Sequence, residues 1–376
     1  MAGKKLRTLF VFGTRPEAIK LCPVVLHLRS RPEFDVQVCV TAQHRSLLDQ
    51  VLDVFGIQPD FDLDLMLLDQ TLSQSTSRIL AGLEPVVCAA RPDVVLVQGD
   101  TTTTLCGALA AFYHRTPVAH VEAGLRTWDR WQPFPEEMNR VLTTQLSSLH
   151  FAATEWAARN LRNEGVPEER IAVTGNSGID AVLYVRDRLR KGVLRGPEWP
   201  QIDPRKKLIV VTAHRRESFG AGFQRICAAL AVLARRPDVQ IMYPVHPNPN
   251  VQAPVKQHLA HLDNVLLLDP LEYVPFVDLM RRAHLLITDS GGVQEEGPSL
   301  GKPILVLREK TERPEAVQAG TVKLVGTDVE CIVRETNLLL DDQAEYERMA
   351  RIHNPYGDGQ ASRRIGDLIL SFLRNN

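Results

Sequence analysis

Short apolar runs alternate with helical patterns along most of this chain of 376 residues. Six runs in the first half have the length and composition of buried parallel strands, namely Leu6–Phe12, Val36–Val40, Val94–Val97, Val118–Val121, Phe151–Ala153 and Ile171–Val173. Helical patterns separate them, such as 16–30, with Pro16 in its first turn, and 44–55, which ends before Gly56. Repeated strand–helix units with right-handed crossovers predict an α/β fold, with helices on both faces of a parallel sheet.

The alternation breaks once, over the polar segment Lys191–Pro204, whose proline and glycine content is typical of an interdomain linker. A second series of apolar runs follows, comprising Leu208–Val211, Gln240–Tyr243, Val265–Leu268, Leu285–Thr288 and Ile304–Leu307. A chain of this length suits two domains. We therefore predict two Rossmann-like domains facing each other across a central cleft, at 1–190 and 205–355. Residues 356–376 are expected to form a C-terminal helix that packs back on the first domain.

The charge balance and the cysteine content restrict the partners of the protein. Its 44 lysine and arginine residues are balanced by 45 aspartate and glutamate residues, so nothing indicates binding to nucleic acid or to a membrane. No apolar run approaches the roughly 18 residues of a membrane span, and the segment before Leu6 is too short for a signal peptide. The six cysteines are scattered without a CxxC pair, and we expect them to be core residues in a reducing cytoplasm.

Four turns between predicted strands and predicted helices carry acids, bases and glycines. They are Phe12–Ala18, Gln98–Thr104, Thr212–Ser218 and Asp289–Glu296. In an open parallel sheet, ligands bind outside the carboxyl ends of the strands, where such turns gather. We therefore expect these turns to form the functional site.

Three carboxylates are predicted near the carboxyl edge of the first sheet. Asp100 and Glu122 each follow a buried strand, and Glu136 comes after two prolines at the start of a helical pattern. Several carboxylates in differing environments suit proton transfer, because their pKa values can be separated. The alternative is that Asp100 and Glu136 only cap helices.

Cationic groups and glycines form another part of the predicted site. Arg15 and Lys20 flank the first turn of the first helix, whose amino end favours phosphate. The triplet Ser290–Gly292 lets a ligand approach backbone amides, although many such triplets are only turns. Glu295 or Glu296 could accept hydrogen bonds from a ribose diol. The second domain is therefore expected to hold a nucleoside diphosphate.

Several common site motifs are missing from the sequence. There is no G-x-G-x-x-G after a strand and no G-x-x-x-x-G-K-[ST], which argues against a dinucleotide redox enzyme and a P-loop phosphotransferase. His214 and His246 stand apart from other metal-ligating residues, so no metal site is predicted. These absences lower the expectation of a redox enzyme, a P-loop enzyme or a metal centre.

Eight ordered motifs resemble those of the non-hydrolysing UDP-N-acetylglucosamine 2-epimerases. They are Gly13–Glu17, Gly99–Thr103, His120–Arg126, Pro135–Arg140, His214–Glu217, Asp289–Gly292, Thr311–Glu315 and Asn354–Gly359. The resemblance extends from about residue 6 to residue 370. It implies a glycosyltransferase B-type fold and a cytoplasmic homodimer that interconverts UDP-N-acetylglucosamine and UDP-N-acetylmannosamine without a metal or a nicotinamide.

The resemblance also implies a reaction and a pathway. UDP would be eliminated to give 2-acetamidoglucal and would be added again after C2 has been protonated on its other face. The product would supply N-acetylmannosamine for cell-surface polysaccharide synthesis.

Individual residues take roles from the same resemblance. Asp100, Glu122 and Glu136 match the acid and base residues of the family as a set, and His214 matches a histidine near the diphosphate. The matches to UDP-contacting positions are Arg15, Lys20, Ser290, Gly291, Gly292, Glu296 and Arg313, with Leu271 and Phe276 around the uridine. A second, activating nucleotide-sugar site of many bacterial members is matched in part by Gln43, His44, Gln70 and His246.

The chain departs from the family pattern at a few positions. Ser46 and Asp69 stand where some relatives have glutamine and arginine, so the activating site differs from theirs while the catalytic set is intact. Residues 176–180 also differ from the commoner Asn-Thr-Val-Ile-Asp.

Other functions use some of the same features. A UDP-sugar-dependent glycosyltransferase of this fold would also bind UDP in its second domain, but it needs an acceptor and fewer acids in the first. A nucleotide-sugar-binding regulator without turnover would not need Asp100, Glu122 and Glu136. A hydrolysing epimerase would release free N-acetylmannosamine, and those enzymes usually carry an additional kinase domain, of which these residues show no sign.

Overall fold

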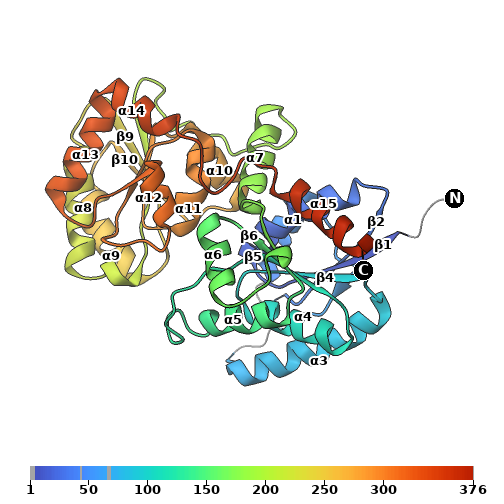
Figure 1. The fold of residues 1–376 in the computed structure, drawn as a ribbon. Helices are drawn as coiled ribbons and strands as arrows, with labels where there is room; N and C mark the ends of the chain where they lie inside the picture. The colour runs from blue at the N-terminus through green and yellow to red at the C-terminus, as the bar shows by residue number, and fades with distance from the viewer. Residues whose placement is uncertain (1–4, 43–44, 66–68, 376) are drawn as a thin grey trace. The chain divides into compact units, whose positions relative to one another are not determined.

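The computed structural model describes residues 5–42, 45–65 and 69–375. The chain divides into two compact units, the first comprising Met1–Ala181 with Gly357–Asn376 and the second Val182–Tyr356 (Figure 1). The division falls inside helix α7 (Ser177–Arg190), so this helix contributes residues to both units. Each unit contains one parallel sheet with its own helices.

The sheet of the first unit has seven parallel strands in the order β3-β2-β1-β4-β5-β6-β7. They are β1 (Leu6–Phe12), β2 (Phe34–Val40), β3 (Phe61–Asp62), β4 (Val94–Gln98), β5 (Val118–Ala123), β6 (Leu149–Ala152) and β7 (Ile171–Val173). Strand β1 is central, with Thr8 opposite Val36 of β2 on one side and opposite Val94 of β4 on the other. The strand order reverses between β1 and β4, which makes this the topological switch point of the sheet.

Helices cover both faces of this sheet. On one face α3 (Leu72–Ala90), α4 (Thr102–Tyr113) and α5 (Glu136–Leu146) lie side by side, and on the other lie α1 (Arg15–Arg29), α2 (Arg45–Phe55) and α15 (Ala361–Asn375). Helix α6 (Glu155–Asn163) and the short helix η1 (Glu168–Arg170) connect β6 to β7. The core under α3 and α4 is built from alternate strand residues such as Leu9, Val11, Val95 and Val97. Alternation follows from the two-residue period of a strand.

The C-terminal helix α15 packs on α1 within the first unit. Asp180 caps α15 by accepting hydrogen bonds from the backbone N–H groups of Ala361 and Ser362, at 3.2 and 2.8 Å. Arg31 and Asp367 add an ion pair at 2.6 Å between the two helices. Because that pair is partly exposed, the cap and the packing contribute more than the ion pair does.

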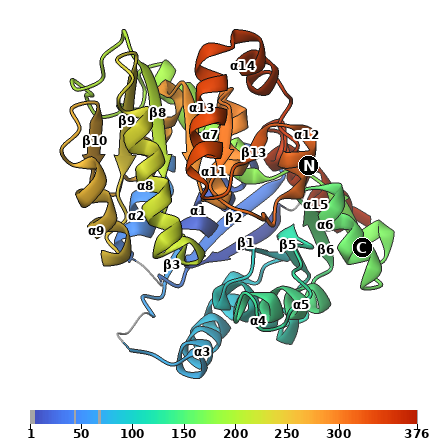
Figure 2. The ribbon, with the colours of Figure 1, turned by 90° about the vertical axis from the view of Figure 1, so that its left-hand side faces the viewer.

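The second unit has six parallel strands in the order β10-β9-β8-β11-β12-β13. They are β8 (Lys207–Thr212), β9 (Val239–Pro244), β10 (Val265–Leu268), β11 (Leu285–Thr288), β12 (Ile304–Val306) and β13 (Val322–Leu324). The helices are η2 (Arg216–Ser218), α8 (Ala221–Leu233), α9 (Pro249–Leu259), α10 (Tyr273–Arg282), α11 (Gly291–Glu296), η3 (Gly297–Leu300), α12 (Pro314–Ala319), α13 (Val329–Asp341) and α14 (Gln343–Ala350). Figure 2 shows β8, β9 and β10 with α8 and α9 beside them. Here the strand order reverses between β8 and β11.

The segment 191–204 packs within the second unit. The indole Nε1 of Trp199 donates a hydrogen bond to Asp278 Oδ2 at 2.8 Å, and Arg282 pairs with the same carboxylate at 3.0 Å. Asp278 is fully buried on α10, so these donors satisfy a carboxylate that would otherwise be costly to bury.

The structure confirms the predicted α/β fold, and every predicted strand is present. Strands β3 and β13 were not predicted, because edge strands of two or three residues are too short to show a pattern.

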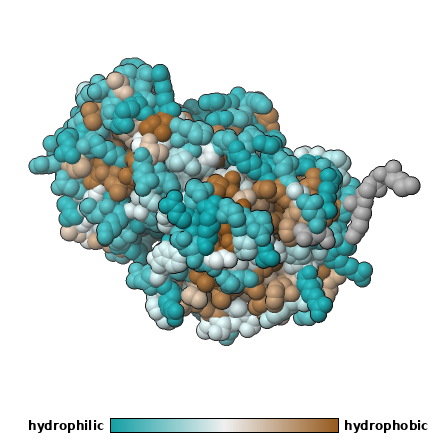
Figure 3. Space-filling model, in the orientation of Figure 1, coloured by the Kyte–Doolittle hydropathy of each residue, from teal (hydrophilic) through white to brown (hydrophobic). Residues whose placement is uncertain are grey.

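No helix in the described parts of the chain is long and apolar enough to cross a membrane. The surface in Figure 3 is mostly hydrophilic with interspersed hydrophobic patches. Four cysteines are buried, as expected, but Cys88 is exposed and Cys331 is partly exposed.

Candidate active site

The four predicted turns lie at the two topological switch points. In the first unit, 12–18 follows β1 and 98–104 follows the neighbouring strand β4. In the second unit, 212–218 follows β8 and 289–296 follows its neighbour β11. Ligands of open α/β sheets bind at such points. Each unit therefore offers one candidate ligand site, described separately below.

Glu17 ties the two turns of the first unit together. Its buried carboxylate accepts hydrogen bonds from the backbone N–H groups of Gly13 and Thr14, at 3.1 and 2.8 Å. It also accepts from the hydroxyl groups of Thr101 and Thr104, at 2.7 and 3.2 Å. Burial raises the pKa of Glu17 although these bonds act in the opposite direction. Glu17 is therefore a positioning residue for both turns.

Gly13 is a glycine because two threonines approach its backbone closely. The hydroxyl oxygens of Thr41 and Thr103 lie 2.9 Å apart. A Cβ atom on residue 13 would lie 2.0 Å from Thr41 Oγ1 and 2.8 Å from Thr103 Oγ1. No side chain fits in this space without displacing both hydroxyl groups.

We expect Gly13→Ala to lower the free energy of unfolding by about 1–3 kcal/mol, the usual cost of overpacking. Urea denaturation would measure this change. Gly222→Ala is the matched control, because a Cβ there meets nothing nearer than 3.6 Å. Adding Thr41→Ala to Gly13→Ala should recover part of the loss, and the absence of any recovery would show that the clash is not its cause.

Glu122 occupies a strained position at the end of β5. Its φ is 62°, and the β5–β6 register shifts between Val121 and Ala123. One carboxylate oxygen of Glu122 pairs with Lys20 Nζ, and the other accepts a hydrogen bond from Gln98 Nε2. A non-glycine residue in the left-handed region costs about 1–3 kcal/mol and persists where its surroundings hold it. Such strain, on a nearly buried acid, is typical of a functional site.

Asp100 is held by an ion pair and does not cap a helix. Arg140 on α5 donates to Asp100 Oδ2 from Nε and Nη2, at 2.9 and 2.6 Å, and from Nη1 to Glu137 at 2.8 Å. Burial opposes the charge of Arg140, but the two carboxylates outweigh it and raise its pKa. Helix α4 is capped instead by Thr101, whose hydroxyl accepts from the N–H of Thr104 at 3.1 Å. The capping interpretation of Asp100 is therefore wrong.

Glu136 has a carboxylate oxygen that the protein leaves unsatisfied. Its Oε2 is buried and has no hydrogen-bond partner among the described residues. Glu136 does not cap α5 either, since the cap position is Pro135. Buried polar atoms are nearly always paired. This carboxylate is therefore suited to meet a ligand or a proton.

A cavity of about 470 Å³ brings two of the three predicted acids together. Asp100 and Glu136 both line it, with Thr14, Asp69 and Gln70. The third acid is adjacent, since a Cβ on Gly99, the residue before Asp100, would lie 3.7 Å from Glu122 Oε2. The first unit thus gathers the acids at the edge predicted from the sequence.

His120 fixes the turn that carries Asp100. Its Nε2 lies 2.7 Å from the carbonyl oxygen of Gly99, so Nε2 carries the proton and donates it. Burial lowers the pKa of His120 to about 3, which keeps the imidazole neutral. Gly99 has a φ of 73° and can adopt this turn without strain.

The two predicted cations of the first unit have different surroundings. Arg15 is the first residue of α1, and its guanidinium has no partner within the described part of the chain. Lys20, one turn later, pairs with Glu122. A Cβ on Gly178 would lie 3.7 Å from Lys20 Cγ. A valine, which is commoner at residue 178 in the family, would therefore contact the aliphatic part of the lysine side chain. The segment 176–180, which differs from the family pattern, thus borders the site.

In the second unit, Asp289 holds the turn after β8. Its buried Oδ2 accepts hydrogen bonds from the backbone N–H groups of His214 and Arg215, both at 2.7 Å. Its Oδ1 lies 3.6 Å from His214 Nδ1. Burial lowers the pKa of His214, and the Asp289 charge offsets this only in part. The His214 ring is therefore neutral at pH 7 and can donate one hydrogen bond.

Gly291 makes room for Arg313. A Cβ on residue 291 would lie only 2.4 Å from Arg313 Cζ, so the guanidinium packs directly against the glycine backbone. Arg313 Nε also donates to Glu295 Oε1 at 2.7 Å, and its Nη1 donates to Glu312 at 2.7 Å. Because Glu295 is buried in this pair, the more exposed Glu296 is the better placed of the two glutamates to meet a ligand.

The remaining predicted residues of the second unit surround this turn. Ser290 is the cap position of α11, with its N–H donating to Thr288 Oγ1 at 2.9 Å, and Gly292 is exposed. Leu271 precedes α10 and Phe276 lies in its first turn, both half-buried. Burial raises the pKa of Tyr273, and the negative charge of Glu296 raises it further. This end of α10 therefore lies near α11.

The residues matched to an activating site are only partly described. Gln43 and His44 lie outside the described residues. Gln70 lines the cavity that holds Asp100 and Glu136. His246, in the second unit, stacks on His214 with ring centroids 5.3 Å apart. Each therefore lies beside a predicted catalytic residue of its own unit.

Several positioning residues lie within the predicted turns and motifs but were given no individual role: Glu17, Gln98, His120, Glu137, Asn139 and Arg140. A signal existed for Glu17, because Thr14 and Glu17 have the spacing of a capping box. The pairing of Arg140 with Asp100 had no local signal, since it joins residues 40 positions apart in the sequence.

Comparisons with known proteins agree with these observations. A family model described as UDP-N-acetylglucosamine 2-epimerase matches residues 26–370. The chain is similar to UDP-N-acetylglucosamine 2-epimerase from Escherichia coli O157:H7, with 58% identity over 376 residues and 99% of each chain covered.

Solved structures give the same relationship. The UDP-GlcNAc 2-epimerase from Neisseria meningitidis bound to UDP-GlcNAc has a TM-score of 0.87 and 48% identity, covering 97% of this chain and 99% of that one. The glycosyltransferase SnogD from Streptomyces nogalater has a TM-score of 0.64 at 15% identity, over 98% of this chain and 100% of that one, which shows a shared fold alone. The predicted glycosyltransferase B-type fold, with two Rossmann-like domains, is confirmed.

Proposed function

Because the chain belongs to the UDP-N-acetylglucosamine 2-epimerase family, we propose that it interconverts UDP-N-acetylglucosamine and UDP-N-acetylmannosamine through 2-acetamidoglucal. The protein is an isomerase, and inversion at C2 requires one proton to leave and one to return. The acid cluster of the first unit carries the proposal. Asp100 and Glu136 line one cavity, and Glu122 lies beside the adjoining Gly99.

The reaction proceeds in two halves. In the first, the bond between C1 and the phosphate oxygen breaks, and its electrons leave with UDP. Positive charge at C1 acidifies the C2 proton, which a carboxylate accepts as the C1–C2 double bond forms. In the second half, an acid returns a proton to the other face of C2, and a UDP oxygen attacks C1.

Asp100, Glu122 and Glu136 serve these proton transfers as a set. Their environments differ, since Asp100 is paired with Arg140, Glu122 with Lys20, and Glu136 keeps one unpaired oxygen. Environments of this kind let one acid be ionised while another holds a proton. The two proton transfers, each made by a carboxyl group, need neither a metal nor a nicotinamide.

The remaining site residues bind UDP in this proposal. A guanidinium with no protein partner, as on Arg15, suits a diphosphate. Neutral His214 donates a hydrogen bond to the leaving phosphate, which stabilises its charge. The other UDP contacts are Lys20, Ser290, Gly291, Gly292, Glu296 and Arg313, with Leu271 and Phe276 beside the uracil and with Gln43, His44, Gln70 and His246 as parts of an activating site.

The wider setting belongs to the same proposal. The enzyme acts as a homodimer in the cytoplasm, and its product supplies N-acetylmannosamine for cell-surface polysaccharide. Self-association is supported by Phe112 and Tyr113 at the end of α4, which are 56% and 65% exposed with ring centroids 6.4 Å apart. Adjacent exposed aromatic residues are typical of protein interfaces.

Proton NMR in deuterated water tests the reaction directly. The protein is incubated with UDP-N-acetylglucosamine alone, without added metal or nicotinamide, and in a second sample with extra UDP-sugar as activator. We expect UDP-N-acetylmannosamine carrying deuterium at C2, because the proton that returns comes from a carboxyl that exchanges with solvent.

Other products would contradict this mechanism in distinct ways. Free N-acetylmannosamine with UDP would indicate hydrolysis. UDP-N-acetylmannosamine without deuterium would exclude a solvent-exchanged base. UDP released only when a sugar acceptor is added would favour the glycosyltransferase alternative.

A further inference from the structure

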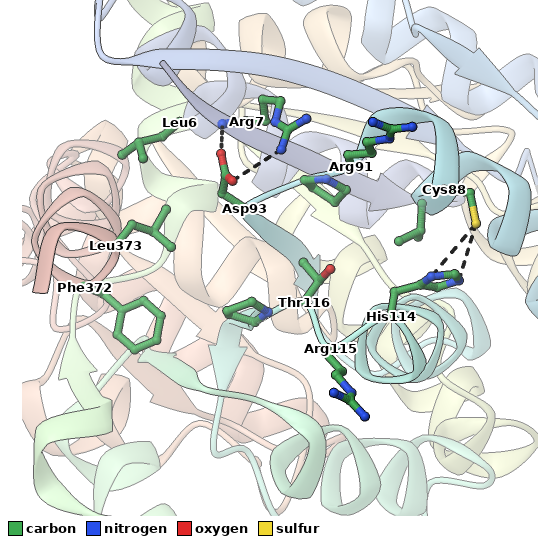
Figure 4. A pocket seen from close by; sticks show the side chains of 13 residues that line it. Leu6, Arg7, Cys88, Arg91, Asp93, His114, Arg115, Thr116, Phe372 and Leu373 are labelled. Atoms are coloured by element: carbon green, nitrogen blue, oxygen red, sulfur yellow. Dashed lines mark hydrogen bonds and ion pairs between the residues drawn. The ribbon is translucent and has the colours of Figure 1, made fainter. Parts of the chain in front are cut away.

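A second cavity of the first unit lies at the amino ends of its strands, away from the acids. Its volume is about 1070 Å³ (Figure 4). It is lined by the start of β1 and by the loops that lead into β4 and β5. The acids follow the other ends of these strands, and five residues of β4 span about 17 Å. The two cavities are therefore separate sites.

Three arginines give this cavity an excess of positive charge. Arg7, Arg91 and Arg115 line it, and Asp93 is its one acidic residue. Asp93 is engaged with Arg7, accepting from its backbone N–H at 2.8 Å and lying 3.5 Å from its Nη2. Figure 4 shows Arg115 across the cavity from Arg7 and Arg91. The lining thus carries two net positive charges in a chain whose net charge is −1.

The guanidinium groups of Arg91 and Arg115 have no ion pair or hydrogen bond with any described residue. Both residues also have left-handed backbone, with φ of 44° and 54°. Glycine or asparagine is the usual residue at such positions after a helix, and arginine there is strained. Because both strained arginines lie on neighbouring loops that line one cavity, we expect their side chains to have a function there.

The ends of α3 and α4 supply an alternative reason for the arginines. Each helix end carries about half a negative charge, which a nearby cation offsets. Two helix ends amount to about one charge, whereas the lining carries two net positive charges. About one positive charge is therefore left over, and it is available to an anion.

The other walls of the cavity are apolar. They include Leu6, Val87, Pro92, Pro117 and Phe372. An anion alone would leave these surfaces in contact with water, whereas a ligand with a flat apolar body would cover them. Guanidinium groups bind phosphate oxygens with two parallel hydrogen bonds. We propose that this cavity binds a nucleoside phosphate, with its phosphate at the arginines and its base against Phe372 and the prolines.

Calorimetry with adenosine diphosphate tests the proposal on the full chain. No UDP is added, because UDP is itself a nucleoside phosphate and would compete with ADP for this cavity. We expect ADP to bind, and we expect the double variant Arg91→Asn/Arg115→Asn to weaken binding at least tenfold. Asparagine tolerates left-handed backbone, so this variant should keep its unfolding temperature. Arg91→Gly/Arg115→Gly is a second variant with the same expected result.

Arg159→Asn is the matched control, because this exposed arginine of α6 lines neither cavity. It should bind ADP like the unchanged protein. No ADP binding, or equal binding by the double variant, would overturn the proposal. Pyrophosphate binding as tightly as ADP would overturn the role of the apolar walls.

Discussion

Replacing Asp100 with asparagine is expected to lower kcat by about two to four orders of magnitude, the usual contribution of a positioned acid or base. Asparagine has the same shape and can still accept a hydrogen bond from Arg140, but it cannot take or give a proton at C2. Arg140 also keeps its pair with Glu137 at 2.8 Å. The fold and the affinity for UDP should therefore be unchanged, which calorimetry and thermal unfolding would check.

Asp35→Asn is the matched control for this variant. Asp35 is an exposed aspartate on β2, and its side chain forms no ion pair with any described residue. Its turnover should equal that of the unchanged protein. Near-normal turnover of Asp100→Asn would remove Asp100 from the mechanism, whereas a parallel loss of UDP binding would mean that Asp100 acts through the shape of the site.

Replacing Arg313 with alanine should weaken UDP binding by about 1.5–3 kcal/mol, the usual contribution of a hydrogen bond to a charged group. The guanidinium lies against Gly291, at the start of the turn proposed to hold the diphosphate. Removing it also takes an ion-pair partner from the carboxylate of Glu295, which is 6% exposed. The variant should therefore be less stable as well, and UDP affinity must be measured well below its unfolding temperature.

Arg236→Ala separates these two effects. Arg236 pairs with Asp238 and Asp341, at 2.8 and 2.7 Å, so its loss also breaks ion pairs of the second unit. It shares no ion-pair partner with Arg313 and has no assigned contact with UDP. We expect it to reduce stability while leaving UDP affinity within about twofold, since sites that share no partner act independently. An equal loss of affinity in both variants would contradict the assignment of Arg313.

The sequence predicted the strands because each is a compact apolar run, and the parallel topology then placed the turns at one edge of each sheet. The positions of Asp100 and Glu122 followed from that rule alone. The contacts that hold these acids could not be predicted in the same way. Gln98 reaches Glu122 across 24 positions, and Arg140 reaches Asp100 across 40. The first contact depends on the pairing of β4 with β5 and the second on how helix α5 packs, and a local pattern encodes neither.

The same limit explains the wrong capping interpretation. Asp100 and Thr101 are adjacent, and both residue types are common caps. Only the folded structure, in which the Thr101 hydroxyl accepts a hydrogen bond from the backbone N–H of Thr104, decides between them. The short strands β3 and β13 were missed for a different reason, because their pairing comes from a neighbouring strand and not from their own composition.

The left-handed backbone of Glu122 lowers the stability of the fold, whereas the proposed reaction needs the carboxylate at this position. A glycine at this position would relieve the strain, and an asparagine would relieve part of it. Selection of variants for heat resistance alone would therefore tend to replace Glu122 and so discard one carboxylate of the site. Thermostable forms of this protein are better sought at exposed helix positions, where stability can increase without loss of an acid.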